Sequence, residues 1–318
     1  MTRTAGEPEN HQTRRAAVQA RARQRQRNQR MTLFSLIVGI AIVLSVGLWW
    51  LTRDEDASAG VALYQFETPD FHSLAFDLGD EDTVYFGSHA GLQVSHDAGR
   101  TWDEGSLRDA DAMQQSVALA DSPRHYVAGH DVLMVSVDGG DTWQSQPNNL
   151  PSLDLHSFAG SPTDPNRLYA IPAGMGLWTS GDGGATWTET AMPTTANTQP
   201  VSLAVAPNRP ERVYLARGGE IAVSDDAGMT WHASPAPEGI VYAITVAADN
   251  DETLYAGTNQ GLFRRNVDRS WERMPLDASN DILALALSPA QPLRIAVVDA
   301  NGNFYRSDDG GTSWDISE

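Results

Sequence analysis

The chain has 318 residues with no cysteine and no lysine, so all 22 of its positive charges are arginines, and its net charge at pH 7 is −19. The missing cysteines exclude disulfide bonds and thiolate metal sites. The acidity is concentrated in residues 57–318, where 36 carboxylates face 13 arginines. This balance argues against a nucleic-acid partner, because little in that region would neutralise phosphates.

The N-terminal region has the pattern of a membrane anchor. Residues 1–31 carry eight arginines against two acids, and residues 32–52 form an uncharged run of 21 residues that contains a tryptophan pair near its end. At about 1.5 Å per residue this run spans a hydrocarbon core of about 30 Å. The arginines place residues 1–31 in the cytoplasm. We therefore expect a basic cytoplasmic arm at 1–31, a transmembrane helix at 32–52, a linker at 53–60 and a periplasmic or extracellular domain at 61–318.

A cleaved signal peptide is the alternative for this region. Ala57-Ser58-Ala59 has the small-x-small form that signal peptidase prefers, and cleavage there would leave a soluble protein that begins at Gly60. The long basic segment and the length of the apolar run favour a retained anchor.

Six copies of the pattern S-x-D-x-G-x-T-W follow in the exported domain. Their last residues are Trp102, Trp143, Trp187, Trp231, Trp271 and Trp314, which are 41, 44, 44, 40 and 43 residues apart. This period is typical of one four-stranded propeller blade. The fifth copy, Arg264–Trp271, is decayed, with Asn266 and Asp268 in the positions of the usual Asp and Gly. The sequence predicts an all-β, six-bladed β-propeller at 61–318, in which residues 61–67 add an outer strand to the last blade and close the ring.

The repeated motif resembles the Asp-box, or bacterial neuraminidase repeat, of sialidases, sortilin-type receptors and photosystem assembly factors. In these families the box lies on a peripheral turn, away from the central pocket. The resemblance therefore implies a structural role for the box carboxylates, which accept hydrogen bonds from turn amides while the glycine adopts a positive φ and the tryptophan packs on the neighbouring blade. The five intact boxes contain Asp97, Asp138, Asp182, Asp226 and Asp309.

The sialidase resemblance does not extend to the catalytic site. Sialidases bind the substrate carboxylate with three arginines, the first of which precedes the first Asp-box. No arginine occurs here between Arg53 and Arg100. We therefore expect no sialidase activity and assign no catalytic residue. A different glycoside hydrolase that uses two carboxylates remains the alternative function.

Histidines, aspartates and one methionine recur at two equivalent places in the first three repeats. Before the inner strands stand Asp70, His72, Asp111, Met113, Asp154 and His156, and after the second strands stand His89 and His130. Radial symmetry would bring these residues to one side of an axial pocket. Such donors suit copper, or zinc without the methionine, and His72, His89, His130 and His156 are the candidate metal ligands. The alternative is structural, in which the histidines cap strand ends and the aspartates cap local turns.

These patterns lead to one functional expectation. We expect a membrane-anchored, extracytoplasmic propeller that acts as a binding or assembly module, with a protein, glycan or metal ligand at the axial pocket. The glycoside hydrolase-like enzyme stays open as the second interpretation.

Overall fold

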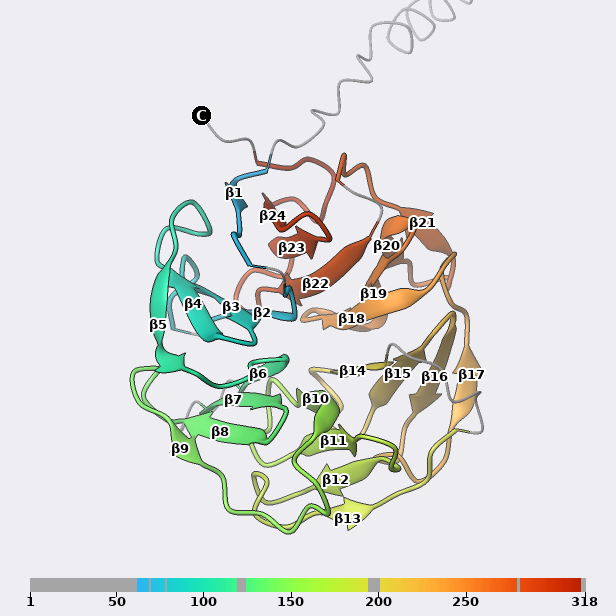
Figure 1. Cartoon of the computed structure of the whole chain (residues 1–318). Coiled ribbons are helices and arrows are strands. Elements are labelled where there is room, and N and C mark those ends of the chain that lie inside the picture. Colours follow the sequence, from blue (N-terminus) through green and yellow to red (C-terminus); the bar gives the residue numbers. More distant parts are fainter. Residues whose placement is uncertain are drawn as a thin grey trace, which may run out of the picture. The chain divides into compact units, whose positions relative to one another are not determined.

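The computed structural model describes residues 62–68, 70–77, 79–118, 124–193, 201–278 and 281–315. Within these residues the chain forms 24 strands, which pair into six antiparallel sheets of four strands each. The sheets are arranged as blades around a common centre (Figure 1). The predicted six-bladed, all-β propeller is confirmed.

The first three blades follow one another along the chain. Blade 1 contains β2 (Ser73–Phe76), β3 (Val84–Ser88), β4 (Gly91–Ser95) and β5 (Asp103–Arg108). Blade 2 contains β6 (Gln114–Ala118), β7 (Arg124–Gly129), β8 (Val132–Ser136) and β9 (Gln144–Ser145). Blade 3 contains β10 (Leu155–Gly160), β11 (Leu168–Pro172), β12 (Trp178–Ser180) and β13 (Thr188–Glu189).

Blades 4 and 5 also follow one another along the chain, whereas blade 6 combines the last three strands with the first strand of the propeller. Blade 4 contains β14 (Val201–Val205), β15 (Val213–Arg217), β16 (Glu220–Ser224) and β17 (His232–Ser234). Blade 5 contains β18 (Val241–Ala247), β19 (Asn250–Thr258), β20 (Gly261–Arg265) and β21 (Trp271–Arg273). Blade 6 contains β22 (Ile282–Leu287), β23 (Ile295–Asp299), β24 (Asn303–Ser307) and β1 (Tyr64–Gln65).

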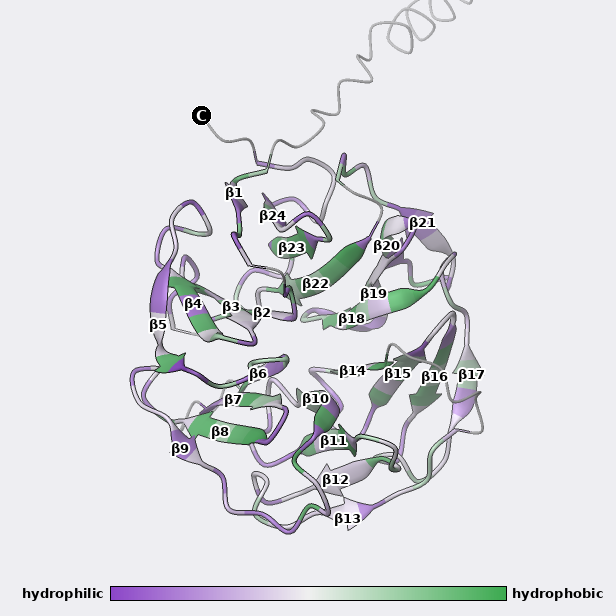
Figure 2. Cartoon of the chain, in the orientation of Figure 1, coloured by the Kyte–Doolittle hydropathy of each residue, from purple (hydrophilic) through white to green (hydrophobic). Residues whose placement is uncertain are grey.

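The innermost strand of each blade faces the centre of the ring. The strands β2, β6, β10, β14, β18 and β22 line an axial cavity of about 200 Å³. Small and large side chains alternate along these strands, as in Ser73-Leu74-Ala75-Phe76, which fits the crowding near a propeller axis. Hydrophobic residues dominate β22 and β23, whereas the outer strands β5 and β9 are more hydrophilic (Figure 2). The core therefore lies toward the inner strands.

Tyrosines in the second strands join neighbouring blades. Each of these hydroxyls donates a hydrogen bond to a backbone carbonyl in the next blade, which satisfies a polar group inside the packed interface. The bonds are Tyr85 to Gly139 (2.6 Å), Tyr126 to Gly183 (3.2 Å), Tyr169 to Pro210 (2.8 Å) and Tyr214 to Asp251 (2.8 Å). The same device thus connects blades 1 to 5 in series.

The N-terminal strand closes the ring as the sequence predicts. Tyr64 of β1 pairs with Phe304 of β24, so β1 is the outermost strand of blade 6. The Phe66 ring, which follows β1, stacks on Phe86 of blade 1 with ring centroids 3.8 Å apart. This short segment therefore contacts both the last blade and the first.

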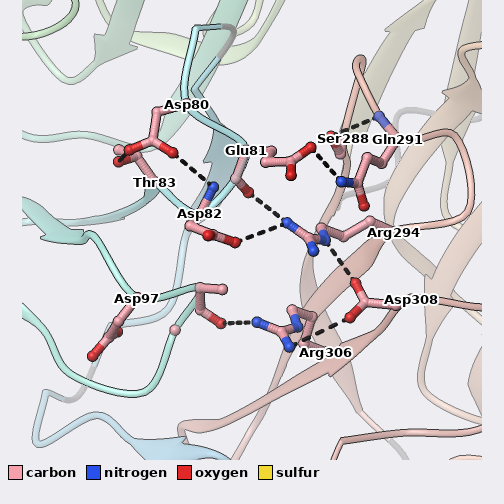
Figure 3. A network of polar contacts seen from close by, with 12 residues as sticks. Asp80, Glu81, Asp82, Thr83, Asp97, Ser288, Gln291, Arg294, Arg306 and Asp308 are labelled. Carbon is pink, nitrogen blue, oxygen red and sulfur yellow. Dashed lines mark hydrogen bonds and ion pairs between the residues drawn. The ribbon is translucent and has the colours of Figure 1, made fainter.

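Two arginines of blade 6 add polar contacts to the same closure (Figure 3). The Arg294 guanidinium donates to Asp308 at 2.6 Å and, across the junction with blade 1, to the Glu81 carbonyl at 2.8 Å and Asp82 at 3.2 Å. Arg306 donates to the Ala98 carbonyl of blade 1 at 2.9 Å. The first and last blades are therefore held together by packed aromatic rings, by the Arg294–Asp82 ion pair and by arginine hydrogen bonds to backbone carbonyls.

The intact Asp-boxes form the predicted turns between the third strand and the outer edge of each blade. In the third box, the Asp182 carboxylate accepts hydrogen bonds from the Ser180 hydroxyl (2.8 Å), the Thr186 amide (2.8 Å) and the Thr186 hydroxyl (2.6 Å). The glycine amide of the turn, at Gly184, donates to Ser180. The other intact boxes repeat this bonding around Asp97, Asp138, Asp226 and Asp309.

The fifth box is one residue shorter than the sequence alignment predicts. In an intact box the first residue is a serine, which pairs with the first residue of the second strand, as Ser95 does with Val84. In the fifth box the residue at this place is Arg265, which pairs with Leu254, and not Arg264. The Arg265 side chain is 1% exposed and donates to Ser234 and Tyr214 of blade 4 and to Glu252 of its own blade. In the fifth box, hydrogen bonds from Arg265 to blade 4 therefore replace the hydrogen bonds that serine and aspartate make in the intact boxes.

The expected anchor lies outside this part of the chain. Residues 1–31, 32–52 and 53–60 are not among those that the structure describes. In the described ranges no helix is long and apolar enough to span a bilayer. The cytoplasmic arm, the membrane helix and the cleavage alternative at Ala59 therefore stay predictions.

Candidate functional site

Seven of the eight predicted pocket residues gather on one face of the ring, where the chain enters the innermost strands. Asp70 and His72 precede β2, Asp111 precedes β6, and Asp154 and His156 stand at the start of β10. His89 and His130 lie in the turns after β3 and β7. We call Asp70, His72, His89, Asp111, His130, Asp154 and His156 the His–Asp row. Its first histidine, His72, also lines the axial cavity.

Two histidines of the row pair with an aspartate of their own blade. Asp70 Oδ2 lies 2.8 Å from His89 Nδ1, and Asp111 Oδ2 lies 2.5 Å from His130 Nδ1. Both pairs form because the segment before the inner strand runs beside the turn after the second strand. Close approach is needed in blade 2, where a Cβ atom at Gly129 would lie 2.1 Å from the Asp111 carbonyl oxygen. A side chain at position 129 would therefore force the two segments apart.

The second ring nitrogen of each paired histidine faces the next blade. His89 Nε2 lies 3.7 Å from Asp111 Oδ2, and His130 Nε2 lies 3.4 Å from Asp154 Oδ1. His156 Nε2 is also 3.4 Å from Asp154 Oδ1. Aspartates and histidines thus alternate without interruption across blades 1, 2 and 3.

Three overlapping groups in the row have the spacing of metal-binding sites. Each contains donor atoms that lie within 4.8 Å of one another. The groups are Asp70, His72 and His89; His89, Asp111 and His130; and His130, Asp154 and His156. Met113 is half-buried, and within the described part of the chain no hydrogen bond or ion pair joins it to the row. The structure therefore brings together the predicted histidines and aspartates, whereas Met113 makes no such contact.

The pKa values of two adjacent histidines in the row are shifted in opposite directions. The hydrogen bond that Asp70 accepts from the His89 ring raises the pKa of His89, whereas burial and the nearby His89 lower the pKa of His72. His72 Nε2 lies 3.2 Å from His89 Nε2. A protonated His89 can donate to Asp70 and to a neutral His72 at once. This end of the row is therefore a hydrogen-bonded network.

The chemistry of this face is polar binding. His89 and His130 are 46% and 48% exposed, so their ring edges are open to a ligand. Imidazole and carboxylate groups can hold a cation, or they can donate to and accept from the polar groups of a protein or a glycan. Asp70 and Asp111 pair closely with histidines, whereas Asp154 Oδ1 lies 3.4 Å from His130 and from His156.

Sequence reasoning missed some of the polar side chains at the axis. Gln114 and Gln115 of β6 and Tyr242 of β18 line the cavity. Gln115 donates to Ser73 at 2.9 Å, and its side-chain oxygen lies 2.9 Å from the buried His125 ring. Their place on innermost strands was the signal that could have identified them.

Comparisons with known proteins place the chain among propellers of several functions. No family model matches it. Xyloglucanase Xgh74A of Acetivibrio thermocellus is 27% identical over 178 residues, which are 50% of this chain and 19% of the enzyme. The chain therefore matches about a fifth of the length of this curated relative.

Solved structures resemble the chain over most of its length. YCF48 bound to D1 peptide has a TM-score of 0.50 at 18% identity and covers 81% of this chain and 84% of its own. The GH74 xyloglucanase of Xanthomonas campestris has a TM-score of 0.54 at 18% identity and covers 80% of this chain and 46% of its own. Identities this low establish the fold alone. The chain is therefore a six-bladed β-propeller with YCF48 and GH74 enzymes among its structural neighbours, consistent with the Asp-box propellers that its sequence resembles.

Proposed function

We propose that this protein is a membrane-anchored, extracytoplasmic binding or assembly module whose ligand docks on the His–Asp row. The observation that carries the proposal is the one-sidedness of the row. It crosses blades 1 to 3, whereas Val201, Tyr242 and Leu283 lie near the equivalent inner-strand positions of blades 4 to 6. Blade 6 keeps an aspartate, Asp281, before its inner strand, but blades 4 to 6 form without the histidines, so the fold does not require those histidines. A partner that contacts one side of the ring accounts for the difference.

The similar proteins support two kinds of ligand, a protein and a glycan. YCF48 is a propeller seen with a bound peptide, and this supports a protein partner for the present chain. The match to a xyloglucanase supports a glycan. The extracytoplasmic setting rests on the charge pattern of residues 1–52.

Capture from membranes tests the binding proposal. Full-length protein with an affinity tag is solubilised from its native host and its copurifying partners are identified and quantified. We expect His89→Ala/His130→Ala to lose a partner that wild type retains. Val137→Ala/Met229→Ala is the matched control, since both residues are exposed on Asp-box turns away from the row. Equal recovery by all three proteins would contradict docking on the row.

A glycoside hydrolase is the second candidate, and the Xgh74A match is the observation that favours it. Incubation of the purified full chain with xyloglucan tests this alternative by the release of reducing ends. The binding proposal predicts no release. If reducing ends are released, and an Asp→Asn change at the axial face abolishes this release, the protein is an enzyme and the binding proposal is wrong.

A further inference from the structure

The His130, Asp154 and His156 group differs from the rest of the row in how its donor atoms are arranged. His130 Nε2 and His156 Nε2 each lie 3.4 Å from the same oxygen, Asp154 Oδ1. Neither contact meets the geometry of a hydrogen bond, and the Asp154 Oδ1 atom is buried without a hydrogen-bond partner, although the Asp154 side chain as a whole is 42% exposed. A carboxylate oxygen in that state is costly unless a cation compensates it.

Two of the three donor separations, both to Asp154 Oδ1, match a tetrahedral metal site, and the donor atoms of the two histidines lie within 4.8 Å of each other. Zinc bonds to histidine nitrogen and carboxylate oxygen at about 2.0–2.2 Å, which places neighbouring ligand atoms about 3.4 Å apart. Copper(II) prefers tetragonal arrangements, in which neighbouring ligands are closer together. Two histidines and one carboxylate leave a fourth position open for water or for a ligand atom.

A histidine that binds a metal through one ring nitrogen must carry its proton on the other, and Asp111 fixes this tautomer for His130. Its Oδ2 atom lies 2.5 Å from His130 Nδ1, so the proton of a neutral ring is held on Nδ1 and the lone pair is left on Nε2. The Asp111 side chain is only 11% exposed, which keeps this contact away from water. An aspartate behind a histidine ligand is the usual way in which proteins orient zinc-binding rings.

The other end of the row lacks this arrangement. His72 Nε2 and His89 Nε2 are 3.2 Å apart, and His89 Nδ1 is 2.8 Å from Asp70, so these groups satisfy one another. Of the four candidate histidines, the geometry therefore favours two as ligands.

The geometry points to a zinc site formed by His130 Nε2, Asp154 Oδ1 and His156 Nε2, with Asp111 as a positioning residue. This inference rests on the proposed function, because the open fourth position lies on the face proposed to dock the partner. An oxygen or nitrogen atom of that partner completes the zinc coordination.

Zinc titration of the full-length protein tests the site without any partner. Detergent-purified protein is freed of metal with a chelator, and zinc alone is added in competition with a chromophoric chelator. We expect one tightly bound zinc per chain in wild type. We expect His156→Gln and Asp154→Asn to lose it, and His72→Gln, the matched histidine outside the group, to keep it.

Two further measurements separate a metal site from a structural one. Asp111→Asn should retain one zinc per chain with an affinity about 10- to 100-fold weaker, as expected for loss of a carboxylate behind a histidine ligand. X-ray absorption of the zinc-loaded wild type should show two imidazoles at about 2.0–2.1 Å. Thermal melts of the metal-free variants establish that each is folded before it is titrated.

The outcomes distinguish this inference from the proposed function. No stoichiometric zinc in wild type, or equal weakening by His72→Gln and His156→Gln, would overturn the zinc site. If partner capture still depends on His89 and His130 in that case, the binding proposal stands. Tight zinc binding with no captured partner would leave the site in place and contradict the docking proposal.

Discussion

Arg294 of blade 6 lies 3.2 Å from Asp82 of blade 1, and this pair joins the two ends of the ring (Figure 3). The Arg294 side chain is 10% exposed, and it also bonds Asp308 and the Glu81 carbonyl. Removal of Arg294 takes away these charge-assisted hydrogen bonds, whereas the Asp82 and Asp308 carboxylates, 55% and 42% exposed, stay solvated.

We expect Arg294→Ala to lower the free energy of unfolding by about 1.5–3 kcal/mol, as is usual for the loss of hydrogen bonds made by a charged group. Arg108→Ala is the control, because its partner Glu104 is on the same strand and both side chains are exposed, so the loss should be about 0–1 kcal/mol. Urea denaturation measures both. Equal losses would mean that the junction does not depend on Arg294.

The decayed fifth box gives a second stability prediction. Arg265→Ala removes the guanidinium that bonds Ser234, Tyr214 and Glu252, so we expect a loss of about 1.5–3 kcal/mol. Arg269→Ala should cost about 0–1 kcal/mol, because that side chain is exposed and its nitrogen is 4.0 Å from Glu252. A variant at 265 as stable as wild type would show that the blade is held by packing alone.

The Asp-box carboxylates predict a loss of stability in acid. Hydrogen bonds from Thr186 and Ser180 lower the pKa of Asp182 from 3.8 to about 2. A carboxylate with a lower pKa in the folded state stabilises the protein above pH 4, and this contribution disappears as the pH falls to about 2. We therefore expect Asp182→Asn to be less stable than wild type at pH 7 and the difference to shrink toward pH 2. Denaturation at both pH values measures it, and a constant difference would contradict the account.

His125 predicts a second acid effect at a higher pH. Burial lowers the pKa of His125 from 6.5 to about 3, so the folded state keeps the ring neutral while the unfolded chain binds a proton below pH 6.5. Stability is therefore lost as the pH falls from 6.5 toward 3. Between pH 7.5 and pH 5 the contribution of this group is about 2 kcal/mol.

The variant His125→Gln lacks this titration and should lose less stability than wild type over the same interval. The comparison is made within each protein across pH, so a constant loss of packing against Tyr85 and Trp143 cancels. Parallel stability curves for the two proteins would rule out His125 as the source.

The sequence predicted the propeller because its decisive signal is local and periodic. Tryptophans 40 to 44 residues apart define the blades, and the apolar residues near Tyr64 define the closing strand. The fifth box was misaligned by one residue because Arg265 performs its role through contacts with another blade. Such contacts depend on how blades pack, which a single repeat does not encode.

The candidate site was predictable as a group but not in its internal bonding. Radial symmetry placed His89 and His130 near the aspartates that precede the inner strands. The pairing of His130 with Asp111 of its own blade and with Asp154 of the next depends on side-chain rotamers and on the close approach at Gly129. Met113 shares the sequence position of His72 and His156, but a shared position does not fix a shared contact.

Site-specific photocrosslinking tests the central claim, that the His–Asp row is the docking surface, most directly. A photoreactive amino acid replaces His89 in full-length protein in intact host cells, and the same substitution at exposed Val137 is the control. The account predicts a discrete crosslinked adduct from position 89 and none from position 137. Adducts of the same kind and yield from both positions, or from position 137 alone, would contradict it.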